Sequence, residues 1–227
     1  DSRVNNAVTY VSPNLNGVVV GLNYGFGEDK DAISGKFSGS ASRYLGTGIT
    51  YDNGPLSLGL ALEQLNRGNR TAAYLGNPPV LVDAGVKTNA WSLGGSYDLG
   101  IVKLAAAYRE SKAISDSQNP QVGNYDVRQK GFMLGASIPV GTAGEIRTTW
   151  NHYSDKTSFG YSNNSYVQKA NALALGYVHN LSKRTALYAN VTRIDNKGNG
   201  KNFNLGNAVL TPGGTSTGAE FGVRHSF

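Results

Sequence analysis

The chain has 227 residues, no cysteine, and 21 Lys and Arg against 15 Asp and Glu, which gives a formal net charge of +6. The lack of cysteine excludes a disulfide scaffold and any thiolate metal site. No apolar run reaches the roughly 20 residues that a spanning helix needs, so a helical membrane protein is excluded. The three histidines (His152, His179 and His225) share no metal-ligand spacing, so neither a metal nor another cofactor is predicted.

Eleven stretches that alternate apolar and polar residues follow one another along the chain. Successive side chains of a strand point to opposite faces, so each stretch is predicted to be a β-strand with one apolar face. The fourth is the clearest, because Leu56, Leu58, Leu60 and Leu62 alternate with small or polar residues. In chain order, the predicted strands cover residues 7–11, 18–26, 44–51, 56–63, 91–97, 102–109, 132–138, 146–151, 172–177, 187–192 and 219–227.

The connectors between these strands are alternately short and long. Tight turns are predicted at 14–17, 52–55, 98–100, 139–144 and 180–184, and long polar connectors at 27–42, 66–87, 111–127, 154–166 and 195–216. Tilted strands of about ten residues cross the hydrocarbon core of a bilayer. Short turns at one end and long loops at the other are typical of an outer-membrane barrel. The predicted fold class is therefore all-β, an antiparallel transmembrane β-barrel.

Three other classes of protein were weighed against this prediction. A soluble β-sandwich also has strands with one buried face, but its strands are usually about five or six residues long, and a Greek key gives no reason for alternating connector lengths. Nucleic-acid binding is not predicted, because the basic residues are scattered. A barrel enzyme would need Asp, His or Ser side chains clustered at one rim, and no such cluster is visible, so an enzyme is not predicted.

An odd number of strands places the two ends of the chain on opposite sides of the membrane. Single-chain bacterial barrels have an even number of strands. We therefore expect an odd number of strands, and a signal peptide, to precede residue 1. Residues 1–227 are then a single unit, the C-terminal portion of a larger barrel.

Several runs of residues resemble one family of channels. They are RVNNAVTY at 3–10 with SPN at 12–14, YDNGPL at 51–56, LGAS at 134–137 with PVG at 139–141, LGYVHNLSKRT at 175–185, and GVRHSF at 222–227. The sequence is similar to the trimeric general-diffusion porins of β-proteobacteria, in particular the anion-selective porins of the comamonad type. The resemblance implies a sixteen-stranded barrel, of which this chain supplies strands six to sixteen. About five N-terminal strands and the inward-folded third loop, which narrows the pore, are then absent.

Selectivity in a pore comes from its width and from the charges that line it. Alternation places Lys103, Arg109, Arg147 and Arg224 on the inward face, with Glu63 and Glu220 as inward acids. A basic lumen concentrates anions, so a weak anion preference is predicted. The resemblance adds Arg3, at a position where anion-selective relatives carry a constriction arginine. Each cation could instead be a wall charge paired with a neighbouring acid.

The predicted function is passive diffusion of small hydrophilic solutes through a porin in the outer membrane of a Gram-negative bacterium. The alternative is another outer-membrane barrel, either a specific transporter or a barrel enzyme. Phe221, Val223 and Phe227 are assigned to the outward face of the strand that closes the barrel. The expected partners are a homotrimer in the full-length form, the lipid bilayer, lipopolysaccharide, and small anions and other hydrophilic solutes.

Basic residues in the predicted connectors could face lipopolysaccharide phosphates. A solvated charge is the simpler interpretation. These residues are Lys30, Lys36, Arg43, Arg67, Arg70, Lys112, Lys156, Lys197 and Lys201.

Overall fold

The computed structural model describes residues 4–27, 42–67, 84–117, 125–159, 165–206 and 210–227, and all the regular structure in them is β-strand. The strands are β1 (Ala7–Val11), β2 (Val18–Gly25), β3 (Arg43–Asn53), β4 (Leu56–Arg67), β5 (Ala84–Asp98), β6 (Lys103–Ser117), β7 (Tyr125–Val140), β8 (Gly144–Phe159), β9 (Ser165–Asn180), β10 (Thr185–Lys197) and β11 (Thr215–His225). Among these residues, no helix has the length and apolarity needed to span a bilayer.

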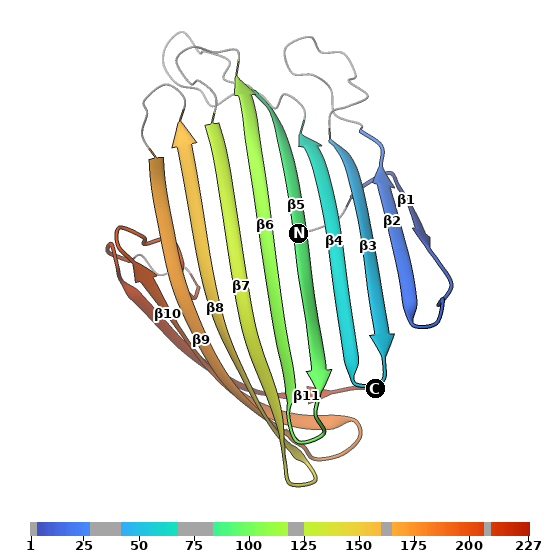
Figure 1. Cartoon of the computed structure of the whole chain (residues 1–227). Helices are drawn as coiled ribbons and strands as arrows, with labels where there is room; N and C mark the ends of the chain where they lie inside the picture. The colour runs from blue at the N-terminus through green and yellow to red at the C-terminus, as the bar shows by residue number, and fades with distance from the viewer. Residues whose placement is uncertain (1–3, 28–41, 68–83, 118–124, 160–164, 207–209) are drawn as a thin grey trace.

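The strands form a single meander. The sheet has 11 strands in the order of the chain, and each strand pairs antiparallel with the next, as between β7 and β8. Figure 1 shows the result, a tall curved wall whose last strands bend around behind the first ones. Every predicted strand is present, so the prediction of an all-β antiparallel fold is confirmed.

The strands in the middle of the wall are longer than predicted. β5 and β6 have 15 residues each, and β7, β8 and β9 have 16 each. They continue into segments predicted as long connectors, so the connector boundaries near 111–127 and 154–166 were wrong. The apolar alternation stops where the sheet leaves the hydrocarbon, whereas the backbone ladder continues because it needs no apolar side chains.

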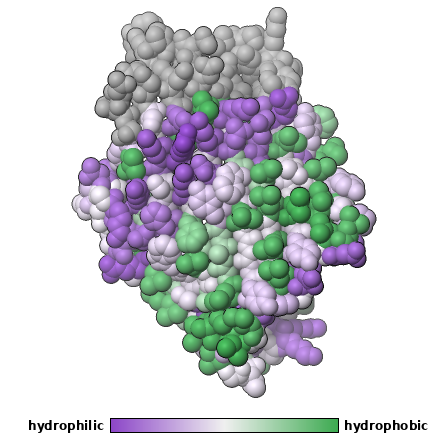
Figure 2. Space-filling model, viewed as in Figure 1, coloured by the Kyte–Doolittle hydropathy of each residue, from purple (hydrophilic) through white to green (hydrophobic). Residues whose placement is uncertain are grey.

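The two faces of the wall have opposite character. The outward face carries the alternating apolar residues, among them Leu58, Leu60 and Leu62, which are 45%, 38% and 47% exposed. Figure 2 shows that apolar residues gather over the lower half of one face and hydrophilic residues form a band above them. Only three apolar residues of the described chain are buried, and all three are alanines (Ala90, Ala170 and Ala186). A sandwich needs a dry interior, so the sandwich alternative does not fit this structure.

The short turns are built from local backbone and side-chain contacts. In the turn between β5 and β6, the Gly100 amide donates to the Asp98 carboxylate at 2.8 Å. Gly100 has a φ of 81°, in the left-handed region that glycine enters without steric cost. The sequence of this turn thus joins two long strands with three residues and fixes their register.

Candidate functional site: the inner wall

The cross-strand register places all four strand cations of the predicted site on the same face of the sheet. Lys103 and Arg147 both lie opposite Ser137, one from each neighbouring strand. Arg109 lies opposite Gly131, and the same register runs on through β9 and β10 to Arg224 at Ala186. This is the face opposite to the exposed leucines, the inner wall. Arg3 lies outside the described residues.

Small residues cover much of the inner wall and leave room above the backbone. A Cβ atom on Gly46 would lie 2.6 Å from the Tyr44 hydroxyl oxygen, and one on Gly222 would lie 2.5 Å from that of Tyr188. The tyrosine rings therefore lie flat over glycines of the next strand positions. A wall of this kind takes up little of the enclosed space, which leaves width for water and solutes.

Arg109 is part of a hydrogen-bonded chain that crosses four strands. Its guanidinium nitrogen lies 2.9 Å from a carboxylate oxygen of Glu63, and the Tyr44 hydroxyl donates to the other oxygen at 3.2 Å. The side chains of Arg109 and Glu63 are 54% and 35% exposed. An exposed pair of this kind is worth about 0–1 kcal/mol of stability. Its larger effect is electrostatic, because the carboxylate cancels most of the field of the guanidinium.

Arg147 has a similar arrangement within one strand. Its guanidinium lies 2.7 Å from Glu145, two residues earlier in β8, and the Ser137 hydroxyl donates to the same carboxylate. Glu145 was not among the predicted inward acids. The alternation itself could have found it, because residues two apart in a strand share a face.

Lys103 and Arg224 differ from the two paired arginines. Neither has an acidic partner within ion-pair distance in the part of the chain that the structure describes. Arg224 lines a small pocket of about 210 Å³ at the short-turn end, together with Lys183 and Arg184 from the turn between β9 and β10. Three cations therefore lie around one polar hollow at this rim of the wall.

The described inner wall carries more acids than the two that were predicted. Four cations on the strands share the inward register with six acids: Asp52, Glu63, Asp98, Glu145, Asp155 and Glu220. Several acids are already engaged; Glu220, for example, accepts from the Asn190 amide at 2.8 Å. The expected excess of strand cations over acids was therefore wrong for these residues, and position along the pore matters more than the total.

The last strand has the predicted orientation. Phe221 pairs with Ala189 and Val223 with Leu187, both in the outward register. Phe221, Val223 and Phe227 are 89%, 64% and 107% exposed. Because β11 has only β10 as a neighbour, its other edge is open in this sheet.

Comparison with known proteins gives consistent matches. The family model described as Gram-negative porin matches residues 1–199. Outer membrane porin protein 32 of Delftia acidovorans is 35% identical over 99% of this chain and 57% of its own length. The solved anion-selective porin from Comamonas acidovorans is 31% identical, with a TM-score of 0.73 over 97% of this chain and 59% of that one. Vibrio cholerae OmpT in its trimer form, 12% identical, has a TM-score of 0.65 over 96% of this chain and 64% of that one, and shows the shared fold.

The chain thus spans a little under three fifths of the length of the porins that it matches with 31% identity or more. The family match confirms the predicted outer-membrane localisation and the prediction that the chain is not an enzyme. It rests on most of the chain, and the solved structures reproduce the same antiparallel wall. The chain belongs to the Gram-negative porin family.

Proposed function

We propose that this chain forms part of the wall of a water-filled channel, through which small hydrophilic solutes diffuse across the outer membrane. The observation that carries the proposal is the two-faced sheet, with exposed leucines outward and Arg109, Arg147 and their carboxylates inward. Charged side chains that remain about half exposed need water, whereas the leucines on the other face need lipid. A curved sheet that separates the two is the wall of a pore.

We also propose that further strands complete the wall. Among the described strands, β1 and β11 each have one neighbour, which leaves two open edges. Open edges do not occur in the hydrocarbon region, because unpaired backbone groups there cost several kcal/mol each. Residues 1–227 would then be the C-terminal portion of a sixteen-stranded barrel, assembled as a homotrimer. The share of the relatives' length that this chain spans supports that arrangement.

A weak preference for anions is part of the proposal. The net charge of +6 supports it, as does the name of the anion-selective porin that this chain resembles. Of the residues assigned to the pore, Lys103 and Arg224 are the stronger candidates, because no carboxylate lies beside them. Arg109 and Arg147 are neutralised by their partners, so each pair contributes mainly polarity. Arg3 remains a candidate on the resemblance alone.

The test is a reversal-potential measurement on the full-length protein in planar bilayers with a KCl gradient. Large stepwise openings with a chloride permeability above that of potassium are expected. Lys103→Gln and Arg224→Gln should each lower the ratio of chloride to potassium permeability, since each removes an uncompensated charge. Absence of stepwise conductance would overturn the channel. An unchanged ratio in both variants would overturn the anion preference while leaving the channel in place.

A further inference from the structure

The outward face carries rows of cations beyond its aromatic residues. An aromatic row of Trp91, Tyr108, Phe132 and Trp150 crosses β5 to β8, with ring centroids 5.1 Å apart for Trp91 and Tyr108 and 6.0 Å apart for Phe132 and Trp150. Tyr and Trp lie at the boundary between hydrocarbon and headgroups in membrane proteins. This row therefore marks where the sheet leaves the hydrocarbon at the long-connector end.

Two residues beyond the aromatic row, in the same register, lies a first row with Lys130 and Lys169. Two residues further lies a second row, in which Lys112 is opposite Arg128 and Arg128 is opposite Lys156. At about 3.3 Å per residue, the rows lie about 7 and 13 Å along the strands from the aromatic rings. That is the depth of the lipid headgroups. We call these five residues the outer cation belt.

The outer cation belt is only partly neutralised by the described protein. Lys112 lies 3.2 Å from Asp126, and Lys130 lies 3.7 Å from Glu110. Arg128, Lys156 and Lys169 are exposed and have no acid within ion-pair distance in the described ranges. Like charges directly opposite each other on neighbouring strands are destabilising. An anion bound across Lys112, Arg128 and Lys156 would relieve that repulsion.

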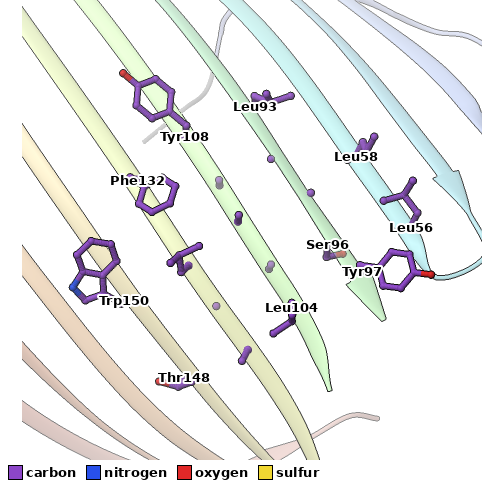
Figure 3. A pocket seen from close by; sticks show the side chains of 18 residues that line it. Leu56, Leu58, Leu93, Ser96, Tyr97, Leu104, Tyr108, Phe132, Thr148 and Trp150 are labelled. Atoms are coloured by element: carbon purple, nitrogen blue, oxygen red, sulfur yellow. The ribbon is translucent and has the colours of Figure 1, made fainter. Parts of the chain in front are cut away.

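Below the aromatic row, the same face is hollowed. A shallow groove of about 960 Å³ crosses β4 to β8, with a floor that includes Gly95, Ala106 and Ala136. Larger apolar side chains border it, among them Leu104 and Trp150, as Figure 3 shows. Its lining is almost entirely apolar, so the groove fits hydrocarbon chains. In Figure 2 the hydrophilic band lies directly above the apolar area of this face.

We propose that the outward face of β6 to β9 binds one outer-leaflet lipid, a glycolipid whose headgroup carries more than one phosphate. Its phosphates lie against the outer cation belt and its acyl chains lie in the apolar groove. Lipopolysaccharide has this chemistry. The proposal rests on the proposed function, because that function places this face in lipid and the long connectors outside. Lys112 and Lys156 were predicted in loops; the structure places both on strands, where their spacing is fixed.

The experiment compares lipid binding by three forms of the full-length porin. The test variant is Arg128→Gln/Lys156→Gln/Lys169→Gln. The control variant, Lys30→Gln/Lys36→Gln/Arg70→Gln, removes the same charge from predicted connectors. The measured quantities are the amount of lipopolysaccharide that copurifies from the outer membrane and the affinity for bisphosphorylated lipid A in detergent. A tenfold or greater loss of affinity is expected in the test variant, with little change in the control.

Three further readings decide the outcome. Wild-type affinity should fall with salt and with removal of one phosphate from lipid A, and vesicles of phosphatidylcholine should not compete. Equal loss in the control variant, or unchanged binding in the test variant, would overturn the proposed site. Displacement of the lipid by inorganic phosphate at similar concentration would show a free-phosphate site and overturn it too. Single-channel conductance, measured in parallel, should persist in both variants; its loss in the parent protein would instead count against the proposed function.

Discussion

The pairing of Arg109 with Glu63 makes a quantitative prediction about ion selectivity. Arg109→Gln leaves Glu63 on the wall with only the Tyr44 hydroxyl as a described partner. The double variant Arg109→Gln/Glu63→Gln removes both charges of a pair whose atoms lie 2.9 Å apart. If the pair acts as a neutral unit, the single variant changes the field in the pore by one charge and the double variant changes it very little.

The magnitude follows from Coulomb's law. At about 7 Å in water, one unit charge acts on an ion with about 0.6 kcal/mol, and screening at 0.1 M salt reduces this roughly twofold. About 0.3 kcal/mol raises the local concentration of potassium roughly 1.6-fold and lowers that of chloride by the same factor. The chloride-to-potassium permeability ratio should therefore fall roughly 2.7-fold in the single variant.

The assay is the reversal potential of the full-length porin in a planar bilayer, measured at about 0.1 M and about 1 M KCl. The Debye length falls to about 3 Å at the higher concentration, so the effect should nearly vanish there. The double variant should return close to the parent ratio at both concentrations. Equal shifts in the single and double variants would refute the reasoning, because Glu63 would then not be compensating Arg109.

Two predictions concern the fold. Leu60→Lys places a charge on the lipid face and should lower the free energy of folding into vesicles by about 2–4 kcal/mol, whereas Ala61→Lys, on the inner wall, should cost much less; the reverse order in urea titrations would mean that the faces have been exchanged. A Cβ atom on Gly144 would lie 2.7 Å from the Val140 carbonyl oxygen, whereas one on Gly59 would meet nothing within 4 Å. Gly144→Ala should therefore destabilise the barrel by about 1–3 kcal/mol and Gly59→Ala by a few tenths, again by urea midpoint; similar midpoints would contradict the crowding at this turn.

The sequence was most informative where one physical cause acts at every residue. Leu56, Leu58, Leu60 and Leu62 alternate because one side of a spanning strand meets hydrocarbon, and that pattern is legible without any coordinates. It was least informative at the outer ends of the strands. There both faces are wet, the alternation disappears, and β6 and β8 were predicted to end near 110 and 153 although they continue to Ser117 and Phe159.

The candidate site divides in the same way. The sequence by itself determined the all-β meander, the lipid and water faces, and the inward position of Lys103, Arg109, Arg147 and Arg224, because a side-chain period of two fixes the face once the strand is known. Only the tertiary structure decided which charges meet. Glu63 and Arg109 are 46 residues apart, and the rows of the outer cation belt likewise depend on which residues lie opposite each other. Register between strands is set by turn lengths and by packing over the whole sheet, and a shift of one residue would exchange every contact.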